Sequence, residues 1–296
     1  MKRIATVSLM ADAGCHIALA NLEEKLLELA KNVEIAYCQI LRDEKKIPKN
    51  VDVALVEGAA RPGHDLEILS AVRDNSRALV AFGSCACFGG LPSLCNLTNL
   101  NELITYVYQQ TATTSRGPIP SKNLPLLVER VRPIGELVRI DYMIPGCIPE
   151  EKEILGVISA ALEGVPFELP RKSVCEECKK ERKGVLNGEI KRNYESPRDS
   201  SRCLLELGYF CVGPSTRAGC GARCPSFNIP CDGCRGPVDV KWDQGVSMLD
   251  SLAAVAKERL TAFSLKTHSA IFHRYTFASS ALQRLISNLE RRKEEM

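Results

Sequence analysis

The sequence lacks several features that would assign it to a class at once. Its 39 basic and 36 acidic residues leave a net charge of +3, which is too small to indicate binding to nucleic acid or to an anionic membrane. No run approaches the about 18 consecutive apolar residues that a membrane-spanning helix needs. No internal repeat of fixed period is present, and four histidines are too few to indicate a histidine-based site. We therefore expect neither nucleic-acid binding nor membrane insertion.

A secretion signal is also missing. The N-terminus opens with Met-Lys-Arg and leads directly into a largely apolar run, without an apolar h-region or a small-residue cleavage site. We expect a cytoplasmic protein. In that compartment the 14 cysteines indicate metal or redox use rather than disulfides.

The chain is long enough for two domains. Its apolar runs alternate with segments of helical periodicity, a pattern typical of a parallel sheet covered on both faces. The expected strands are 2–10, 33–39, 51–57, 77–82 and 137–144. The expected helices are 16–31, 64–75, 99–110, 150–163, 244–259 and 277–295. We predict an α/β fold, with a flavodoxin-like doubly wound domain over 1–168 and a loop-rich, cysteine-containing domain with C-terminal helices over 169–296.

Three cysteines follow the ends of predicted strands. Cys15, Cys85 and Cys147 come just after the first, fourth and fifth strands, beside glycines that allow close backbone approach. Ligands of open α/β sheets bind at the carboxyl ends of the strands. The sequence therefore predicts that three thiols converge in one crevice.

A fourth ligand is needed to complete a cubane at this crevice. Asp12 precedes Cys15 by three residues, the spacing of a C-x-x-C motif whose first cysteine is exchanged for a carboxylate. The rival ligands are Cys87 and Cys95, and Asp12 could instead cap the helix that begins near His16. Because a carboxylate is a harder and weaker iron ligand than a thiolate, ligation by Asp12 predicts a labile fourth iron or an altered potential.

Other residues near the crevice have simpler interpretations. Cys38 lies within a predicted strand and is expected in the core. His16 could hydrogen-bond a cluster sulfide. Glu57, at the end of the third strand, could handle protons, but local capping or pairing is favoured.

Of the remaining eight cysteines, six lie between Cys203 and Cys234, in a glycine- and proline-broken segment that has no periodicity of a packed element, and Cys175 and Cys178 form a C-x-x-C just upstream. The eight divide into a compact set and a dispersed set: Cys220, Cys224, Cys231 and Cys234; and Cys175, Cys178, Cys203 and Cys211. Two structural zincs are an alternative, but zinc ribbons use paired C-x-x-C knuckles on hairpins, and the intervening chain has no strand pattern. Four-thiolate iron–sulfur clusters fit better.

Taken together, these motifs resemble the small subunits of [NiFe] hydrogenases, which are related to the twenty-kilodalton subunit of NADH–quinone oxidoreductase. The resemblance rests on Gly-Cys-His at 14–16, Val-Glu-Gly at 56–58, GSCACFGG at 83–90, PGCIP at 145–149, VCEEC at 174–178 and the cysteine-rich run to Cys234. It covers essentially the whole chain and looks most like the cytoplasmic subunits of archaeal type.

The resemblance implies three [4Fe-4S] clusters and no catalytic residue in this chain. A proximal group would comprise Asp12, Cys15, Cys85 and Cys147. A medial group would comprise Cys220, Cys224, Cys231 and Cys234. A distal group would comprise Cys175, Cys178, Cys203 and Cys211. Most of the family has cysteine where this chain has Asp12, so the proximal ligation is the main departure.

The resemblance also implies partners. Electrons would come from the nickel–iron site of a separate large subunit and leave to a flavin- or iron–sulfur-containing partner, either a deazaflavin-coenzyme (coenzyme F420) reducing subunit or a heterodisulfide reductase. Two alternatives remain open: a subunit on the quinone side of a complex-I-like enzyme, which usually carries one cluster, and a non-redox zinc-binding interaction protein.

Overall fold

The computed structural model describes residues 1–44, 46–115, 117–186, 191, 201–256 and 270–286. A five-stranded sheet forms its first half, with strand order β2-β1-β3-β5-β7, and every pairing in it is parallel. These strands are β1 (Lys2–Ser8), β2 (Val33–Cys38), β3 (Val51–Glu57), β5 (Ser76–Phe82) and β7 (Tyr142–Ile144). Counted within the sheet, the order is 2-1-3-4-5, that of flavodoxin-like folds, so the predicted fold class is confirmed.

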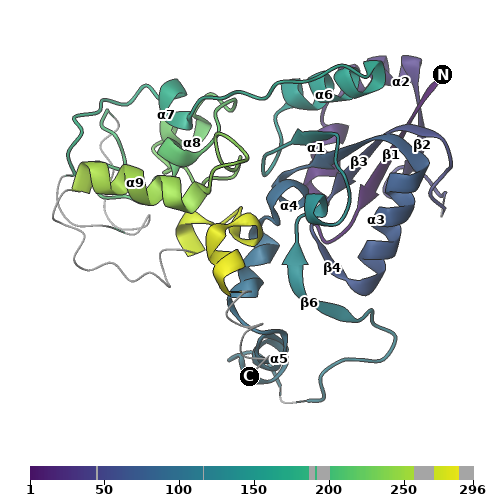
Figure 1. Cartoon of the computed structure of the whole chain (residues 1–296), viewed down its shortest axis with the longest axis horizontal. Coiled ribbons are helices and arrows are strands. Elements are labelled where there is room, and N and C mark those ends of the chain that lie inside the picture. Colours follow the sequence, from purple (N-terminus) through teal and green to yellow (C-terminus); the bar gives the residue numbers. More distant parts are fainter. Residues whose placement is uncertain (45, 116, 187–190, 192–200, 257–269, 287–296) are drawn as a thin grey trace.

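Helices cover both faces of this sheet (Figure 1). They are α1 (Gly14–Ala20), α2 (Glu24–Asn32), α3 (Gly63–Asn75), α4 (Ser84–Phe88) and α6 (Glu151–Glu163). One apolar cluster joins the sheet to α1 and α6, and a second joins its other face to α3 and α4. Because both faces are covered, β3 and β5 are almost entirely apolar, in contrast to the alternating pattern of a half-exposed strand.

Two expected elements differ from the structure. The helix predicted over 16–31 is broken into α1 and α2 by Glu23, which has a φ of 51°. The strand predicted over 137–144 is reduced to β7, because its first residues continue a helical turn. The N–H groups of Leu137 and Val138 both donate to the Ile134 carbonyl at 3.0 Å, and the parallel pairing with β5 begins at Tyr142.

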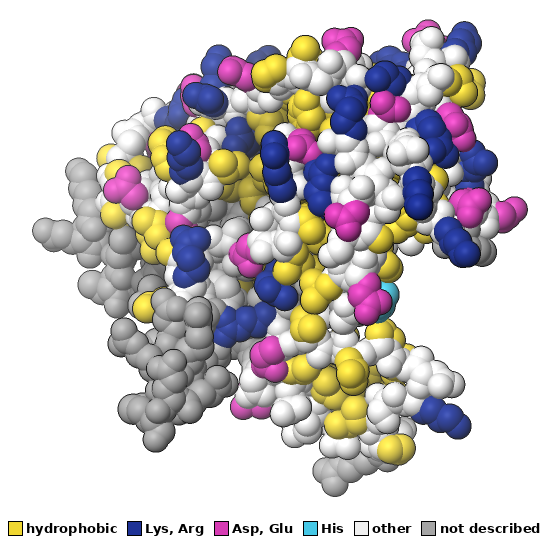
Figure 2. All heavy atoms as spheres, turned by 45° about the vertical axis from the view of Figure 1, so that its right-hand side comes forward, with side chains coloured by type: hydrophobic (Ala, Val, Ile, Leu, Met, Phe, Trp, Pro, Cys, Tyr) yellow, Lys and Arg dark blue, Asp and Glu magenta, His cyan; other side chains and the backbone are white. Residues whose placement is uncertain are grey.

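A second, two-stranded sheet was not predicted. It pairs β4 (Ala60–Pro62) with β6 (Leu127–Arg132) in antiparallel fashion. Between them the chain forms η1 (Leu91–Leu97), α5 (Leu100–Thr105) and the π-helical η2 (Tyr106–Gln110). Exposed apolar side chains are frequent here, Leu126 among them, and hydrophobic atoms lie on the lower lobe of the molecule in Figure 2.

The second half of the chain is built mostly from loops. Its regular elements are α7 (Val174–Glu177), η4 (Gly213–Ser215), α8 (Arg223–Ser226), α9 (Gln244–Ala256) and η5 (Phe277–Ser279). Another short helix, η3 (Ile134–Glu136), precedes β7 in the first half. A third apolar cluster contains buried Cys211 and Cys231 and packs against α9. Asp243 caps α9, since its carboxylate accepts the Val246 N–H at 2.8 Å.

The expected C-terminal helices are only partly covered. Residues 257–259 and 287–295 of the two predicted helices lie outside the described residues. η5 returns to the first half, where Ala278 N–H donates to Ser93 Oγ at 3.3 Å. None of the described helices is long and apolar enough to cross a membrane.

Candidate metal centre

The three strand-end cysteines lie together, as the sequence predicts. Cys15 is in the first turn of α1, Cys85 is in α4 after β5, and Cys147 follows β7. Burial, together with the neighbouring Cys147 and Asp12, raises the pKa of the Cys85 thiol to about 12. Burial, and then Glu57 and Cys85, likewise raise the pKa of Cys15. Thiols crowded in this way become thiolates readily only where a metal supplies positive charge.

Glycines make room for these sulfurs. A Cβ added at Gly83 would overlap Cys15 Sγ, and one added at Gly90 would overlap Cys85 Sγ. Both glycines also have positive φ, at 85° and 58°. The backbone therefore approaches the proximal group more closely than a side chain would allow.

Asp12 faces the same thiols, because its charge acts on both Cys85 and Cys147. One of its carboxylate oxygens accepts the Gly14 N–H at 3.0 Å, at the start of α1. The N-cap itself is Ala13, so Asp12 stands one residue before it. The position of Asp12 is thus compatible with the predicted role as a cluster ligand and with a local hydrogen-bonding role at the start of α1.

The rival ligands lie differently. Cys87 is buried in the apolar cluster beneath the sheet, and its thiol donates to the Ala81 carbonyl at 3.4 Å. Cys95 lies in η1, where Arg61 Nη1 donates to its sulfur at 2.7 Å. Cys38 is buried within β2, as expected. Cys87 nevertheless lies near enough to Cys15 to raise the pKa of that thiol, so Asp12 stays the predicted fourth ligand and Cys87 stays its rival.

Glu57 is fully buried at the end of β3 and caps α1. Its carboxylate accepts the backbone N–H groups of Cys15 and His16, both at 3.1 Å, and the Ser8 hydroxyl at 2.8 Å. Burial alone would raise the pKa of Glu57, but His16 and Ser8 hold it below its usual range. The prediction that Glu57 caps and pairs locally is confirmed.

His16 contributes an observation that the sequence could not provide. Its Nδ1 lies 2.7 Å from Glu57 Oε1, without hydrogen-bond alignment. Its Nε2 is buried and has no hydrogen-bond partner among the described residues. A buried polar atom next to Cys15 fits a site that a bound group completes.

The medial group also gathers in space, with three of its thiols acting on one another. Burial, together with the neighbouring Cys220 and Cys224, raises the pKa of Cys234 to about 11. The fourth member, Cys231, is buried, and the nearby Cys211 and Cys234 raise its pKa in addition to burial. Its backbone N–H donates to Cys211 Sγ at 3.3 Å. The medial group is thus directly joined to the distal group.

The distal group surrounds a small, nearly apolar hollow. All four of its cysteines line this hollow, beside Gly213 and Pro214. A Cβ at Gly213 would lie 3.3 Å from Cys175 Sγ and 3.6 Å from Cys211 Sγ. Burial raises the pKa of Cys175 to about 12, and Cys211 and Cys203 add to the increase.

The proximal and medial groups meet through the loop that carries Cys147. The backbone N–H of Cys147 acts on the Cys234 sulfur and lowers its pKa. Ser84 Oγ accepts the Gly146 N–H at 3.0 Å and itself donates to the Cys234 carbonyl. Tyr275 lies beside both groups, since Cys147 and Cys234 raise its pKa in addition to burial. Sequence reasoning missed Ser84 and Tyr275 as contacts of the site, although Ser84 stands within a quoted motif.

The donor set as a whole fits iron–sulfur clusters. Eleven cysteines and one carboxylate form three groups, each partly buried and each shaped by glycines or backbone N–H donors. Backbone N–H groups directed at sulfur are typical of iron–sulfur sites. In the described part of the chain, no three His, Cys, Asp or Glu side chains meet closely enough to hold a single metal ion.

Comparison with known proteins assigns the class. The family model described as "NADH ubiquinone oxidoreductase, 20 Kd subunit" matches residues 13–161. A subunit of the vhu F420-non-reducing hydrogenase of Methanocaldococcus jannaschii is 41% identical over 282 residues, which cover 95% of this chain and 97% of that protein. The iron–sulfur subunit of the F420-non-reducing hydrogenase of Archaeoglobus profundus is 29% identical over 92% of this chain and 94% of its own length.

A solved structure agrees with these relatives. A chain of an NAD+-reducing [NiFe]-hydrogenase in the H2-reduced state is 38% identical, with a TM-score of 0.54, and the match covers 57% of this chain and 96% of that one. The chain therefore belongs to the family of the 20 kDa subunit of NADH ubiquinone oxidoreductase and, within it, to the small subunits of hydrogenases.

Proposed function

We propose that this chain is the electron-transfer subunit of a [NiFe] hydrogenase complex. It connects the nickel–iron site of a large subunit to an electron-accepting partner, and it carries no complete active site of its own. The observation that supports this most strongly is the continuity of the three cysteine groups. Cys147 meets Cys234 at one junction, and Cys231 meets Cys211 at the other.

The proximal, medial and distal groups each hold one [4Fe-4S] cluster in this proposal. When bound, such clusters supply one-electron carriers whose potentials depend on burial and on hydrogen bonds to sulfur. The chain's residues provide the ligands, keep water from the buried thiols and direct backbone N–H groups at Cys211 and Cys234. The twelve predicted ligands are part of the proposal, and so is the domain boundary at 168/169. This boundary is supported by the apolar clusters of the two halves, which share no residue.

The names of the relatives bear on the choice between the two acceptors. Two proteins that match over more than nine-tenths of this chain are named as subunits of F420-non-reducing hydrogenases. Of the two acceptors considered, a heterodisulfide reductase is therefore favoured over a coenzyme F420 reducing subunit. The quinone-side alternative is less well supported, because all eight medial and distal cysteines lie beyond residue 161, where the 20 kDa family match ends.

The test uses the complex of this chain with its large subunit. Under dihydrogen, we expect the broad absorbance of the chain at roughly 400 nm to bleach, as it does for reduced iron–sulfur clusters. The chain alone should bleach with dithionite but not with dihydrogen. A complex whose large subunit is active, but whose absorbance bleaches with dithionite only, would contradict the proposal.

A further inference from the structure

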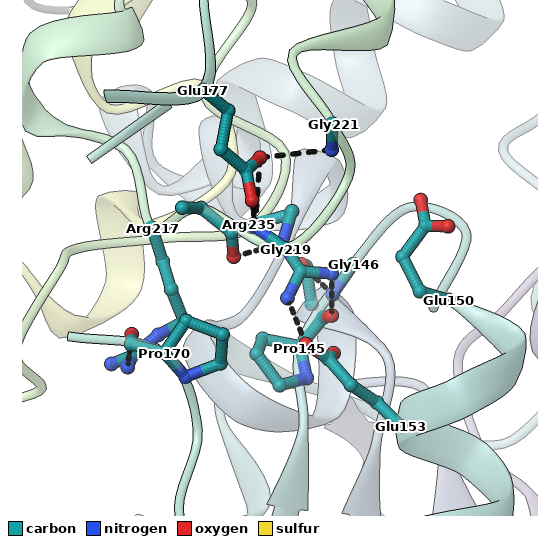
Figure 3. A network of polar contacts seen from close by, with 12 residues as sticks. Pro145, Gly146, Glu150, Glu153, Pro170, Glu177, Arg217, Gly219, Gly221 and Arg235 are labelled. Carbon is teal, nitrogen blue, oxygen red and sulfur yellow. Dashed lines mark hydrogen bonds and ion pairs between the residues drawn. The ribbon is translucent and has the colours of Figure 1, made fainter. Parts of the chain in front are cut away.

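Two arginines are buried where the cysteine-rich half meets α6. The exposed fractions of Arg217 and Arg235 are 4% and 1%. Arg235 is the residue directly after Cys234. Figure 3 shows Arg235 directed at Pro145, in the loop that leads to Cys147, whereas Arg217 reaches Pro170, whose carbonyl accepts from its Nη1 at 2.8 Å. Because burial of a charge costs several kcal/mol unless it is paired and hydrogen-bonded, this arrangement needs a reason.

Arg235 joins three separate segments. Its Nη2 contacts Glu153 Oε1 of α6 at 2.5 Å, and its Nε donates to the Ala218 carbonyl at 3.0 Å. Its Nη1 donates to the Pro145 carbonyl at 3.3 Å, two residues before Cys147. The guanidinium of Arg235 therefore connects the loop that carries Cys147, a proximal cysteine, to the segment that carries Cys234, a medial cysteine.

The fit around this pair is tight. A Cβ added at Gly219 would lie 2.7 Å from Arg235 Nη2 and 2.8 Å from Glu153 Oε1. The carboxylate of Glu153 is itself nearly fully buried. The ion pair cannot shift far, so the positions of Cys147 and Cys234 relative to each other depend on it.

The charge of Arg235 reaches the sulfur sites. Arg235 directly follows Cys234 and is only 1% exposed, so water screens its charge little from the medial ligands. In a low-dielectric interior such an interaction is much stronger than at the surface. A buried cation next to a cluster ligand stabilises the reduced state of the cluster, because that state carries more negative charge. The anionic carboxylate of Glu153 opposes this effect in part.

We propose that Arg235, held by Glu153, is a positioning residue that fixes the loop of Cys147 against Cys234 and raises the reduction potential of the cluster bound by the medial group. This rests on the proposed function. The charge acts through the Cys234 ligand, and the three hydrogen bonds act on the spacing between the proximal and medial groups.

The test is an EPR-monitored redox titration of the complex with its large subunit. Arg235→Gln removes the cation, so the medial signal should titrate at a more negative potential than in wild type. Glu153→Gln removes the opposing anion and should move it to a more positive potential. Arg235→Lys keeps the charge and should stay near the wild-type value. Opposite shifts from the two partners are not expected of a purely structural pair, whose loss would disturb the site in the same way from either side.

The chain provides a matched control. Arg223 directly precedes Cys224 and pairs with Glu150 at 2.9 Å, but 63% of its side chain is exposed. Arg223→Gln should leave the medial potential unchanged, because water screens exposed charges.

The outcomes separate this inference from the proposed function. If the Arg235→Gln protein does not fold, the Glu153→Gln protein provides the test. If neither of these proteins folds, Arg235→Lys provides it, and its medial signal must then stay at the wild-type potential. Unmoved potentials, shifts of the same sign in both Gln variants, or a displaced Arg235→Lys signal would overturn the inference. Wild-type protein without any reducible cluster would instead overturn the proposed function.

Discussion

Replacing Gly83 with alanine is expected to remove the proximal cluster and to leave the other two in place. A Cβ at this position overlaps Cys15 Sγ, and the fixed backbone of Gly83, whose N–H donates to the Ile144 carbonyl at 2.8 Å, cannot move away cheaply. Iron analysis should fall from about 12 to about 8 atoms per chain, since each cubane holds four. The medial and distal EPR signals should persist.

Gly184 provides the control for backbone strain. It has a φ of 72°, but no atom lies within 4 Å of the Cβ that alanine would add. Gly184→Ala therefore also places an alanine at a positive φ, at a cost of about 1–2 kcal/mol, but without touching a sulfur. It should retain all of its iron. A Gly83→Ala protein with full iron content and an unchanged proximal signal would show that Cys15 is not a ligand in the proposed position.

Substitutions of Asp12 are expected to change the iron content and the potential of the proximal cluster. Asp12→Ala should cost the proximal cluster one iron and convert its EPR signal to that of a three-iron cluster, because the fourth iron loses its ligand. Asp12→Cys should keep a complete cubane but change its potential, since thiolate is a softer and stronger donor to iron than carboxylate. Mössbauer spectra and a redox titration of the two variants measure both results.

Cys87 provides the matched test of the rival ligand. Its thiol donates to the Ala81 carbonyl inside the apolar cluster, so Cys87→Ala should leave the proximal cluster intact. Loss of the cluster in Cys87→Ala, combined with an unaffected Asp12→Ala protein, would identify Cys87 as the fourth ligand and contradict our assignment.

The fold was largely predictable because burial on both faces marks the strands. The runs Val51–Glu57 and Ala78–Phe82 are apolar almost throughout and short, which is typical of strands buried on both faces. The pairing of β4 with β6 was not predictable, since Ala60–Pro62 is only three residues long and its partner follows more than sixty residues later. The shortening of β7 reflects the turn in which Leu137 and Val138 donate to the Ile134 carbonyl, and the apolar periodicity of 137–144 does not reveal that turn.

The cysteine groups were predictable for a different reason. Parallel strands end at one edge, so Cys15, Cys85 and Cys147 had to be neighbours once the topology was fixed. Arg235 and Ser84 escaped notice because their roles come from contacts between distant segments, such as that of Arg235 with Glu153. The only available signal for Arg235 was its position directly after Cys234.

The central claim is that this chain holds three four-iron clusters. Iron and acid-labile sulfide analysis of the anaerobically purified chain tests it most directly, with Mössbauer spectroscopy to count cluster types. We expect about 12 irons and as many sulfides per chain, in a brown protein that bleaches on reduction. A colourless protein that contains zinc, or one that contains only about four irons, would contradict it.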